Sequence, residues 1–383
     1  MFISRRSFLR GVGMGAATGV AMQWPLQETS QAARVEPARA TQPGGPVRLD
    51  SNENAYGPSA KTMAAMRIAL DSANRYPFKQ YDKLTAEIAT FHGVKPEQVL
   101  LGCGSTEILR VAAAAFLGKG KQLVQALPTF ETIEQYARSS GSEVVSVPLT
   151  KDFAHDLDAM LAHAGAMPSF VYICNPNNPT ASITPRADLE NFVAKLPASS
   201  YVLIDEAYHH FAGGPPSYVS FLDRPVNDER LILMRTFSKV YGLAGMRLGF
   251  AIASPTLIER MRPFITGINV NGIVMPGALA AMHDTEAVAD SVKKNANVRQ
   301  EFFKQAASRN LTFIESHTNF VMMETHRPAR EVIEHFRNNN VWIGRPFPAF
   351  PTHARVSFGT PDEMQAFWRV WDLAPFAKMT ATQ

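Results

Sequence analysis

Six short apolar runs alternate with helical stretches between residues 99 and 253, and this alternation constrains the fold more than any other feature. The runs that predict buried strands cover residues 122–126, 143–147, 170–174, 201–205, 231–234 and 249–253. Each ends at polar residues, Gly or Pro, as strands buried on both faces commonly do. The alternation predicts βαβ crossovers, and therefore an α/β domain with a mostly parallel sheet that binds ligands at the carboxyl ends of its strands.

The chain after residue 264 predicts a second, smaller α+β unit. Residues 285–307 predict a long helix, and residues 312–323 and 354–358 predict strands. About 340 residues follow the first forty, and the chain is 46% hydrophobic. A chain of this length can bury two cores, so we expect two domains.

Lys239 lies in a stretch, residues 236–250, that combines its amine with a hydroxyl, a guanidinium and apolar side chains. A lysine condenses with an aldehyde only as the neutral amine, so its pKa must be lowered by cationic neighbours or by desolvation. Arg247 and the apolar residues of 243–250 provide both. Ser238 and Arg247 are groups that hold a phosphate ester. A surface Ser-Lys pair is the alternative, but the combination indicates pyridoxal phosphate.

Residues 102–107 follow strand-like residues 98–101 and open an apolar helix at 108–116. Glycines at a helix entry let backbone N–H groups approach a phosphate, and the helix dipole favours an anion there. Ser105 and Thr106 are therefore candidate phosphate ligands. An ordinary capping box, with either residue as the N-cap, is the alternative.

Asp205 ends the predicted strand 201–205. A buried carboxylate against the pyridine nitrogen would keep that nitrogen protonated, so that the ring draws electrons from the substrate. A helix N-cap at a strand end is the alternative for Asp205.

These segments together resemble the fold-type I pyridoxal-phosphate aminotransferases of class I/II, in particular the histidinol-phosphate aminotransferase branch. The resemblance runs from Leu49-Asp50-Ser51-Asn52-Glu53-Asn54 to Arg355-Val356-Ser357-Phe358-Gly359-Thr360. It implies a large cofactor-binding domain at residues 76–270. It also implies a small domain that joins residues 41–75 to residues 271–383.

The resemblance assigns further residues to the site. Asn178 and Tyr208 would donate to the phenolic oxygen of the cofactor, and Phe130 would stack on its ring. Tyr76 would reach the phosphate of a neighbouring subunit, which implies a homodimer with shared sites; on its own, Tyr76 reads as a packed loop aromatic. The sequence departs from the family pattern at Ala181, where Gly is usual.

Two arginines complete the substrate site that the resemblance implies. Arg355 would clamp the substrate α-carboxylate or its equivalent, and Arg345 would reach a distal phosphate. A solvated loop arginine is the alternative for Arg345. With Lys239, Asp205 and Tyr208 as catalytic residues, the expected reaction is transamination between an amino acid or histidinol-phosphate-like amine and a 2-oxo acid. A decarboxylase or lyase on the same scaffold, or a non-catalytic protein that binds the cofactor, stays open.

Charge and cysteine content limit the other partners. The formal charge is +4 and falls to +1 without residues 1–40, which hold five Arg and two Glu, so no nucleic acid is expected. No Cys/His spacing resembles a metal site. Cys103 and Cys174 are expected to be free buried thiols, with a disulfide as the alternative.

Residues 1–40 predict a twin-arginine signal peptide. Ser4-Arg5-Arg6-Ser7-Phe8-Leu9-Arg10 matches the motif, and the weakly apolar residues 11–22 are too few for a membrane helix of about 20 residues. Cleavage would follow Ala40 or Ala32. We therefore expect the Tat translocon to export the folded enzyme to the periplasm or beyond, with a basic disordered N-terminus or an uncleaved anchor as the alternative.

Overall fold

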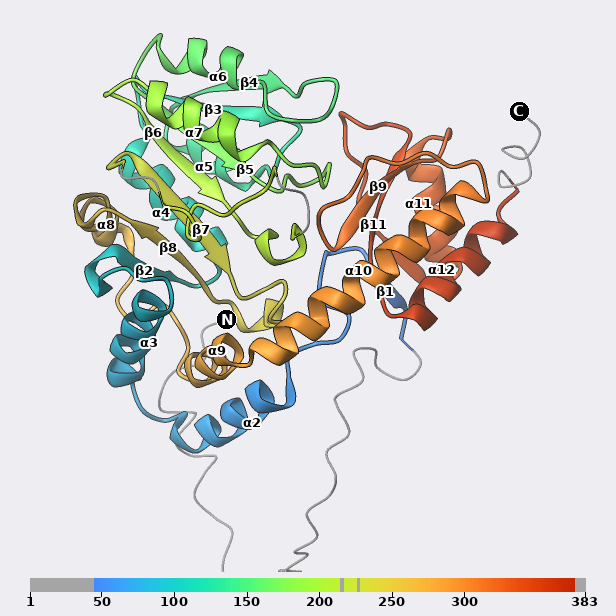
Figure 1. The fold of residues 1–383 in the computed structure, drawn as a ribbon, viewed down its shortest axis with the longest axis horizontal. Helices are drawn as coiled ribbons and strands as arrows, with labels where there is room; N and C mark the ends of the chain where they lie inside the picture. Colours follow the sequence, from blue (N-terminus) through green and yellow to red (C-terminus); the bar gives the residue numbers. More distant parts are fainter. Residues whose placement is uncertain (1–44, 214–216, 226–227, 376–383) are drawn as a thin grey trace, which may run out of the picture. The chain divides into compact units, whose positions relative to one another are not determined.

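The computed structural model describes residues 45–213, 217–225 and 228–375, and its centre is a seven-stranded sheet (Figure 1). The strands are β2 (Val99–Gly102), β3 (Gln122–Leu127), β4 (Glu143–Pro148), β5 (Ser169–Cys174), β6 (Tyr201–Asp205), β7 (Leu231–Thr236) and β8 (Gly249–Ala253). They follow the order β2-β8-β7-β6-β5-β3-β4, and β8 runs antiparallel to both of its neighbours. The pairs among β7, β6, β5, β3 and β4 are parallel, which confirms the predicted α/β sheet.

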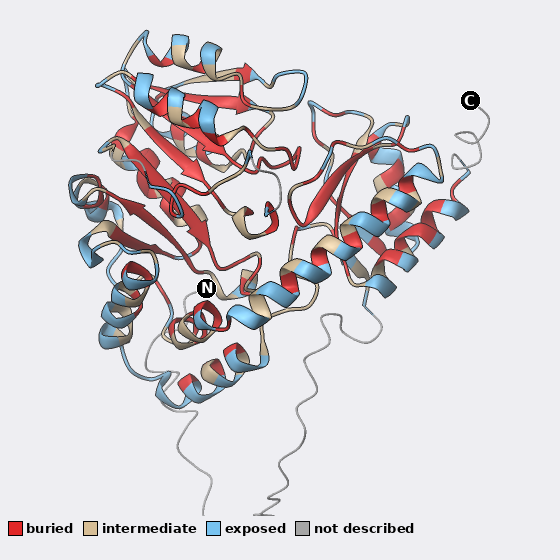
Figure 2. Ribbon diagram, in the orientation of Figure 1, coloured by how far each residue is buried: buried red, intermediate tan, exposed pale blue. Residues whose placement is uncertain are grey.

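Helices cover both faces of this sheet. One face carries α4 (Ser105–Phe116), α5 (Thr132–Ser139) and α8 (Pro255–Met261); the other carries α3 (Phe78–Phe91), α6 (Leu157–Ala164), α7 (Arg186–Lys195) and α9 (Val274–His283). Alternate strand residues supply the two cores, as the pleat requires. In β5, Phe170 and Tyr172 belong to the first core, and Val171 and Ile173 belong to the second. Figure 2 shows the strands buried and the helices exposing their outer faces.

A further core lies among the C-terminal elements. It holds the antiparallel strands β9 (Phe320–Glu324) and β11 (His353–Ser357) and the helices α10 (Thr285–Ala307), α11 (Ala329–Asn338) and α12 (Pro361–Leu373). β1 (Val47–Leu49) pairs in parallel with β10 (Val341–Ile343). The start of the described chain is thereby tied to its C-terminal part, as the family resemblance implies.

The helix that follows β1 packs against the main sheet unit rather than against the C-terminal core. α2 (Ala60–Ala69) lies against α9, and a Cβ at Gly277 of α9 would collide with the side chain of Met66. Met66 and Val274 belong to the core of the main sheet. The domain boundaries at residues 41–75, 76–270 and 271–383 stay predictions. Short 3-10 turns complete the list: η1 (Leu70–Ser72), η2 (Pro96–Gln98), η3 (His209–Phe211), η4 (Ala244–Met246) and η5 (Arg262–Phe264).

The strand predicted at residues 312–323 is wrong in its first half. Phe313 forms an isolated bridge to Met323, and β9 begins only at Phe320. The hydroxyls of Ser316 and Thr318 donate to the carbonyl of Phe320 and close a turn just before β9. Short hydroxyl side chains of this kind compete with strand pairing. The predicted signal at residues 1–40 lies outside the described residues. Within the described part, no helix is long and apolar enough to cross a membrane.

Candidate active site

A cavity of about 650 Å³ opens where β5, β6 and β7 reach their carboxyl ends. Parallel strands end at one edge of a sheet, so residues far apart in sequence meet there. Eleven of the twelve predicted site residues line this cavity, and Tyr76 does not. They are Ser105, Thr106, Phe130, Asn178, Asp205, Tyr208, Ser238, Lys239, Arg247, Arg345 and Arg355.

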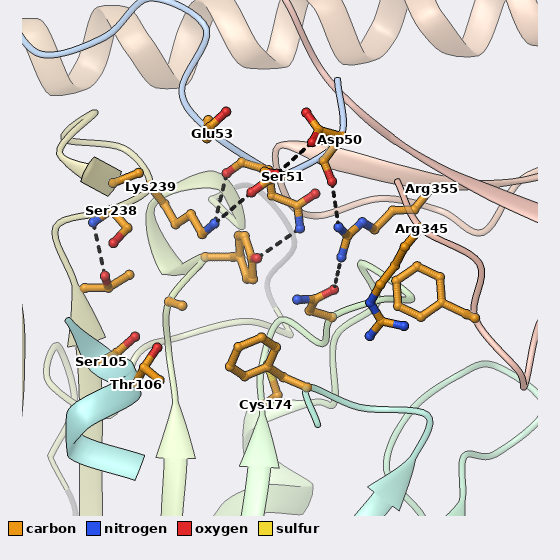
Figure 3. Close-up of a pocket in the computed structure, with 18 of the residues that line it drawn as sticks. Asp50, Ser51, Glu53, Ser105, Thr106, Cys174, Ser238, Lys239, Arg345 and Arg355 are labelled. Atoms are coloured by element: carbon orange, nitrogen blue, oxygen red, sulfur yellow. Dashed lines mark hydrogen bonds between the residues drawn. The ribbon is translucent and has the colours of Figure 1, made fainter. Parts of the chain in front are cut away.

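Lys239 follows β7 and points towards the N-terminal segment (Figure 3). Its Nζ donates to the backbone carbonyls of Asn52 at 3.0 Å and Ser51 at 3.4 Å. Burial, and after it the positive charge of Arg355, lower the pKa of Lys239 to about 8. Arg247, the cationic neighbour expected from the sequence, has a smaller effect than Arg355. A larger fraction of the amine is therefore neutral near pH 8 than for a lysine at its usual pKa, and the neutral form is the one that reacts with an aldehyde.

Ser105 and Thr106 occupy the first turn of α4, and its N-cap is Gly104 with φ 75°. The capping-box alternative, in which Ser105 or Thr106 is the N-cap, is therefore wrong. Glu107 accepts a hydrogen bond from the backbone N–H of Cys103 at 2.7 Å instead. The side-chain hydroxyls at this helix start stay directed to the cavity, where the helix dipole favours an anion.

Two glycines let three segments converge on the same point. A Cβ at Gly104 would collide with the guanidinium of Arg247, and a Cβ at Gly249 would collide with the backbone of Ser105. Arg247 has φ 58°, a left-handed conformation, and its Nη1 lies 2.9 Å from the carbonyl of Ala244 and 3.5 Å from Ser238 Oγ. The result is a cradle of one guanidinium, three hydroxyls and a helix N-terminus, which fits a phosphate monoester.

Asp205 lies at the base of the cavity and is 3% exposed. Its Oδ2 accepts a hydrogen bond from the Tyr172 hydroxyl at 2.9 Å, and its Oδ1 accepts one from the N–H of Ala207 at 3.0 Å. Burial raises the pKa of Asp205 to about 6, while these two donors and Lys239 oppose the rise. Asp205 does not cap a helix, because the N-cap of the following η3 is Tyr208. A cationic ring nitrogen at this carboxylate would restore its charge.

Asn178 and Arg355 are joined at the other side of the cavity. Arg355 Nη1 donates to Asn178 Oδ1 at 2.8 Å, and Nη2 donates to the carbonyl of Asp50 at 2.9 Å. Arg355 is 9% exposed, and its buried Nε has no partner among the described residues. Since an unpaired buried donor is costly, this atom favours an incoming carboxylate or phosphate oxygen.

Arg345 lies at the mouth of the cavity and already has a carboxylate partner. Its Nη2 is 2.5 Å from Glu131 Oε2, and its Nη1 donates to the carbonyl of Pro346 at 3.1 Å. Its guanidinium also lies 4.3 Å from the ring centre of Phe347. The solvated-loop alternative stays open, because the side chain of Arg345 is 53% exposed although it lines the cavity and forms an ion pair.

Asn52 is a site residue that we did not predict from the sequence. It is 1% exposed with φ 55°, and its Nδ2 donates to the Tyr208 hydroxyl at 3.1 Å. Its Oδ1 accepts from Ser357 of β11, and its carbonyl accepts from Lys239. One residue thus connects the lysine, the tyrosine and the C-terminal unit. A buried Asn in the matching segment 49–54 was the available signal, since Asn tolerates the left-handed region.

The remaining predicted residues lie as follows. Tyr76 is 81% exposed and lies outside the cavity of its own chain. Both cysteines are free; Cys174 is buried, but Cys103 is exposed, so the prediction of two buried thiols is wrong for Cys103. Among the described residues, no group of three or more His, Cys, Asp or Glu side chains is placed to hold a metal ion.

The cavity residues fit pyridoxal phosphate on geometry alone. The phosphate cradle at α4, the amine of Lys239 and the carboxylate of Asp205 are the three groups that its phosphate, aldehyde and ring nitrogen require. In the part of the chain that the structure describes, the Nδ2 of Asn178 has no hydrogen-bond partner, which leaves it free for the phenolic oxygen.

Comparison with known proteins agrees with this geometry. Residues 45–370 match the family model of aminotransferase class I and II. The chain is 34% identical over 325 residues to a histidinol-phosphate aminotransferase of Caldicellulosiruptor saccharolyticus, covering 84% of this chain and 89% of that one.

Two solved structures are similar over most of their length. A putative histidinol-phosphate aminotransferase from Erwinia carotovora atroseptica has a TM-score of 0.83 and 36% identity, over 88% of this chain and 97% of that one. The histidinol-phosphate aminotransferase from Sinorhizobium meliloti, in complex with pyridoxal-5'-phosphate, has a TM-score of 0.80 and 26% identity, over 87% and 90%. The chain therefore belongs to the aminotransferase class I and II family.

Proposed function

We propose that this aminotransferase uses pyridoxal 5'-phosphate to move an amino group between an amino acid or a phosphate-bearing amine and a 2-oxo acid. The observation that carries this proposal is the convergence of Lys239, Asp205 and the phosphate cradle of α4 on one cavity. The Sinorhizobium relative binds the same cofactor. The relatives are aminotransferases, which favours amino transfer over decarboxylation, elimination or cofactor binding without turnover.

When bound, the cofactor supplies an aldehyde for the donor amine and a ring that draws electrons from the donor α-carbon. Asp205 would hold a proton on the ring nitrogen, and Asn178 and Tyr208 would donate to the phenolic oxygen. Lys239 Nζ, neutral above its lowered pKa, would take the proton from the donor α-carbon and return it to the cofactor carbon. Arg355 would fix the donor so that this proton faces Lys239.

The cofactor assignment has a direct test. Borohydride reduction of the yellow holoenzyme should fix the cofactor covalently to Lys239, and peptide mapping would locate it. Label on another lysine would refute the assignment. Lys239→Ala should keep the cofactor through the phosphate cradle but lose turnover.

The donor class follows from Arg345 and Arg355. Two guanidiniums on one cavity favour a donor with two anionic groups, or one bearing a phosphate. Arg345→Ala should raise KM for histidinol phosphate roughly 10- to 100-fold and leave a neutral aromatic amino acid nearly unchanged. Equal small effects on the KM of both donors would show that Arg345 does not bind a distal anion of the donor.

We further propose a homodimer in which Tyr76 contributes to the neighbouring site. The side chain is 81% exposed and follows the exposed apolar residues Ile68 and Leu70. An aromatic so exposed next to apolar neighbours is typical of a covered surface.

Export through the twin-arginine pathway remains our proposal for localisation. It rests on the motif Ser4-Arg5-Arg6-Ser7-Phe8 and the following weakly apolar residues. Replacing both arginines by lysine should leave a folded, active enzyme in the cytoplasm. Wild-type enzyme that accumulates uncleaved in the cytosol would contradict export.

A further inference from the structure

Arg345, which the proposed function assigns to a distal anion, forms an ion pair with a carboxylate that the proposed function does not use. Glu131 precedes α5 and belongs to the α/β sheet unit, while Arg345 follows β10 of the C-terminal unit. Their side chains meet at 2.5 Å and are 45% and 53% exposed. The pair therefore joins the two units. Of its two members Arg345 lines the cavity, beside Arg355 (Figure 3).

The pair occupies the fork of Arg345. One terminal nitrogen holds Glu131, the other holds the carbonyl of Pro346, and the face of the guanidinium lies over Phe347. These two bonds use two of the five N–H groups of the guanidinium, so an incoming anion either displaces the carboxylate of Glu131 or binds beside it against its negative charge. The charges of Glu131 and Arg345 also act in opposite directions on the pKa of Arg355, so the pair is electrostatically part of the substrate site.

A second guanidinium of the cavity has no carboxylate partner in the part of the chain that the structure describes. Arg337 of α11 lines the same cavity, and its contact is with the ring of Trp342 at 5.7 Å. Among the described residues, no ion pair of Arg337 is found. Arg345 and Arg337 thus place two guanidiniums on one cavity, and this charge favours a group with more than one negative charge.

We infer that Glu131 is a specificity-determining residue, which competes with the distal anion of the donor for Arg345. This inference rests on the proposed function. A distal carboxylate replaces Glu131 like for like and gains little. A phosphate monoester has a charge of about −1.5 to −2 and three acceptor oxygens, so it gains contacts with both arginines that the carboxylate of Glu131 does not make. A neutral donor leaves the pair in place.

The expected effect is moderate because both side chains are partly exposed. Exposed ion pairs contribute little, so removing the competitor should improve binding of distal anions by about 2- to 5-fold. The effect should shrink at high salt, since the pair is accessible to screening ions. Distal carboxylates should benefit as much as phosphates or more, which would reduce the discrimination between the two.

The test uses the holoenzyme and the variant Glu131→Gln. Steady-state kinetics with histidinol phosphate, glutamate and histidinol would separate distal phosphate, distal carboxylate and no anion. The KM values for histidinol phosphate and glutamate should fall about 2- to 5-fold, and that for histidinol should stay unchanged. Glu134→Gln is the matched control, because it removes a carboxylate of α5 that pairs with the exposed Arg138. It should leave all three values unchanged.

Two further measurements isolate the competition. In the Arg345→Ala background, Glu131→Gln should have no effect on KM, and a persisting fall would overturn the mechanism. Calorimetric binding of inorganic phosphate to the holoenzyme needs no turnover, and it should tighten in Glu131→Gln. Unchanged or weakened phosphate binding overturns the inference. Absence of transamination with every donor would instead overturn the proposed function.

Discussion

At the scale of the residue, the reactivity of Lys239 depends on how its surroundings change the pKa of its amine. The amine lies in a cavity beside Arg355, and burial and that guanidinium both disfavour the ammonium form. The pKa of about 8 puts the neutral form within the physiological range. A lysine at its usual pKa would be almost entirely charged there.

This placement predicts the pH dependence of cofactor uptake. The rate at which apoprotein captures pyridoxal phosphate should rise with pH through a midpoint of about 8, because only the neutral amine reacts. Arg355→Met removes a neighbouring positive charge, so the pKa of Lys239 and the midpoint should move to higher pH. Arg355→Lys keeps a charge and should move it less. Stopped-flow absorbance measures the rate, and an unmoved midpoint in Arg355→Met would contradict the coupling.

Asp205 serves the proposed reaction but is predicted to lower the free energy of unfolding of the apoprotein at neutral pH. Its folded-state pKa of about 6 lies above the unfolded value near 3.8, so the folded apoprotein binds more protons between pH 4 and 6. The free energy of unfolding therefore falls as pH rises through that window, by about 2–3 kcal/mol. Asp205→Asn should remove this loss, giving an apoprotein more stable than the wild type at pH 7.5 but inactive as holoenzyme.

Urea unfolding at pH 4.5 and pH 7.5 measures this difference. The Asn variant should lie close to the wild type at the lower pH and above it at the higher pH. Tyr172→Phe is an informative companion, because loss of the 2.9 Å hydrogen bond should raise the pKa of Asp205 further. A wild type whose stability rises between the two pH values, relative to Asp205→Asn, would refute the cost assigned to this carboxylate.

The sequence predicted the residues whose chemistry is specific and missed those whose role is positional. Lys239 and Asp205 were predicted from the chemistry of their side chains and neighbours, and Arg355 from the family resemblance. Glu131 and Tyr172 carry no motif, and only the fold brings Glu131 to Arg345 across 214 positions of sequence separation. Asn52 lay within a matching segment, yet its contact with Tyr208 depends on a left-handed backbone that no spacing reveals.

At the scale of the element, the site depends on how closely three segments approach. The start of β8 lies so near the start of α4 that Gly249 leaves no room for a Cβ beside Ser105. Gly249→Ala should therefore push the N-terminus of α4 away from the cavity. We expect a cofactor Kd raised at least about 10-fold and a free energy of unfolding lowered by about 1–3 kcal/mol.

Gly245→Ala is the matched control for this substitution. Gly245 lies four residues earlier, in η4, and a Cβ there meets nothing within 4 Å. It should leave cofactor affinity unchanged in fluorescence titration. Equal affinity in Gly249→Ala would show that the helix start is not what holds the phosphate.

Buried strands were predictable as elements because each is an apolar run between polar breaks. β6 and β8 begin and end where the sequence indicated, and so does α10. The prediction failed at residues 312–319, where apolar residues flank Ser316 and Thr318 and the turn is closed by their hydroxyls. Ala181 takes φ 61° where the family pattern has Gly, so the expected turn forms in spite of the departure.

At the scale of the whole molecule, the proposed dimer explains a group of exposed apolar side chains. Ile68, Leu70, Tyr76 and Phe78 are 74%, 55%, 81% and 63% exposed, and they lie between the end of α2 and the start of α3. Such a cluster is unfavourable on an isolated chain and is typical of an interface, which buries about 800 Å² per partner in a stable dimer.

The double variant Ile68→Asp with Phe78→Glu should convert the dimer to monomers. Dimer formation would bury the new carboxylates of both chains without a partner, which is unfavourable. Neither side chain is buried in the single chain, so the fold should persist in circular dichroism. Since Tyr76 would no longer reach a neighbouring phosphate, cofactor affinity should fall together with the dimer, as seen by analytical ultracentrifugation and titration. Leu373→Asp places a charge at a 70% exposed leucine on α12, outside this cluster, and should remain dimeric with unchanged affinity. A monomeric wild type, or a double variant that stays dimeric, would remove Tyr76 from the site and leave the cofactor to the residues of one chain.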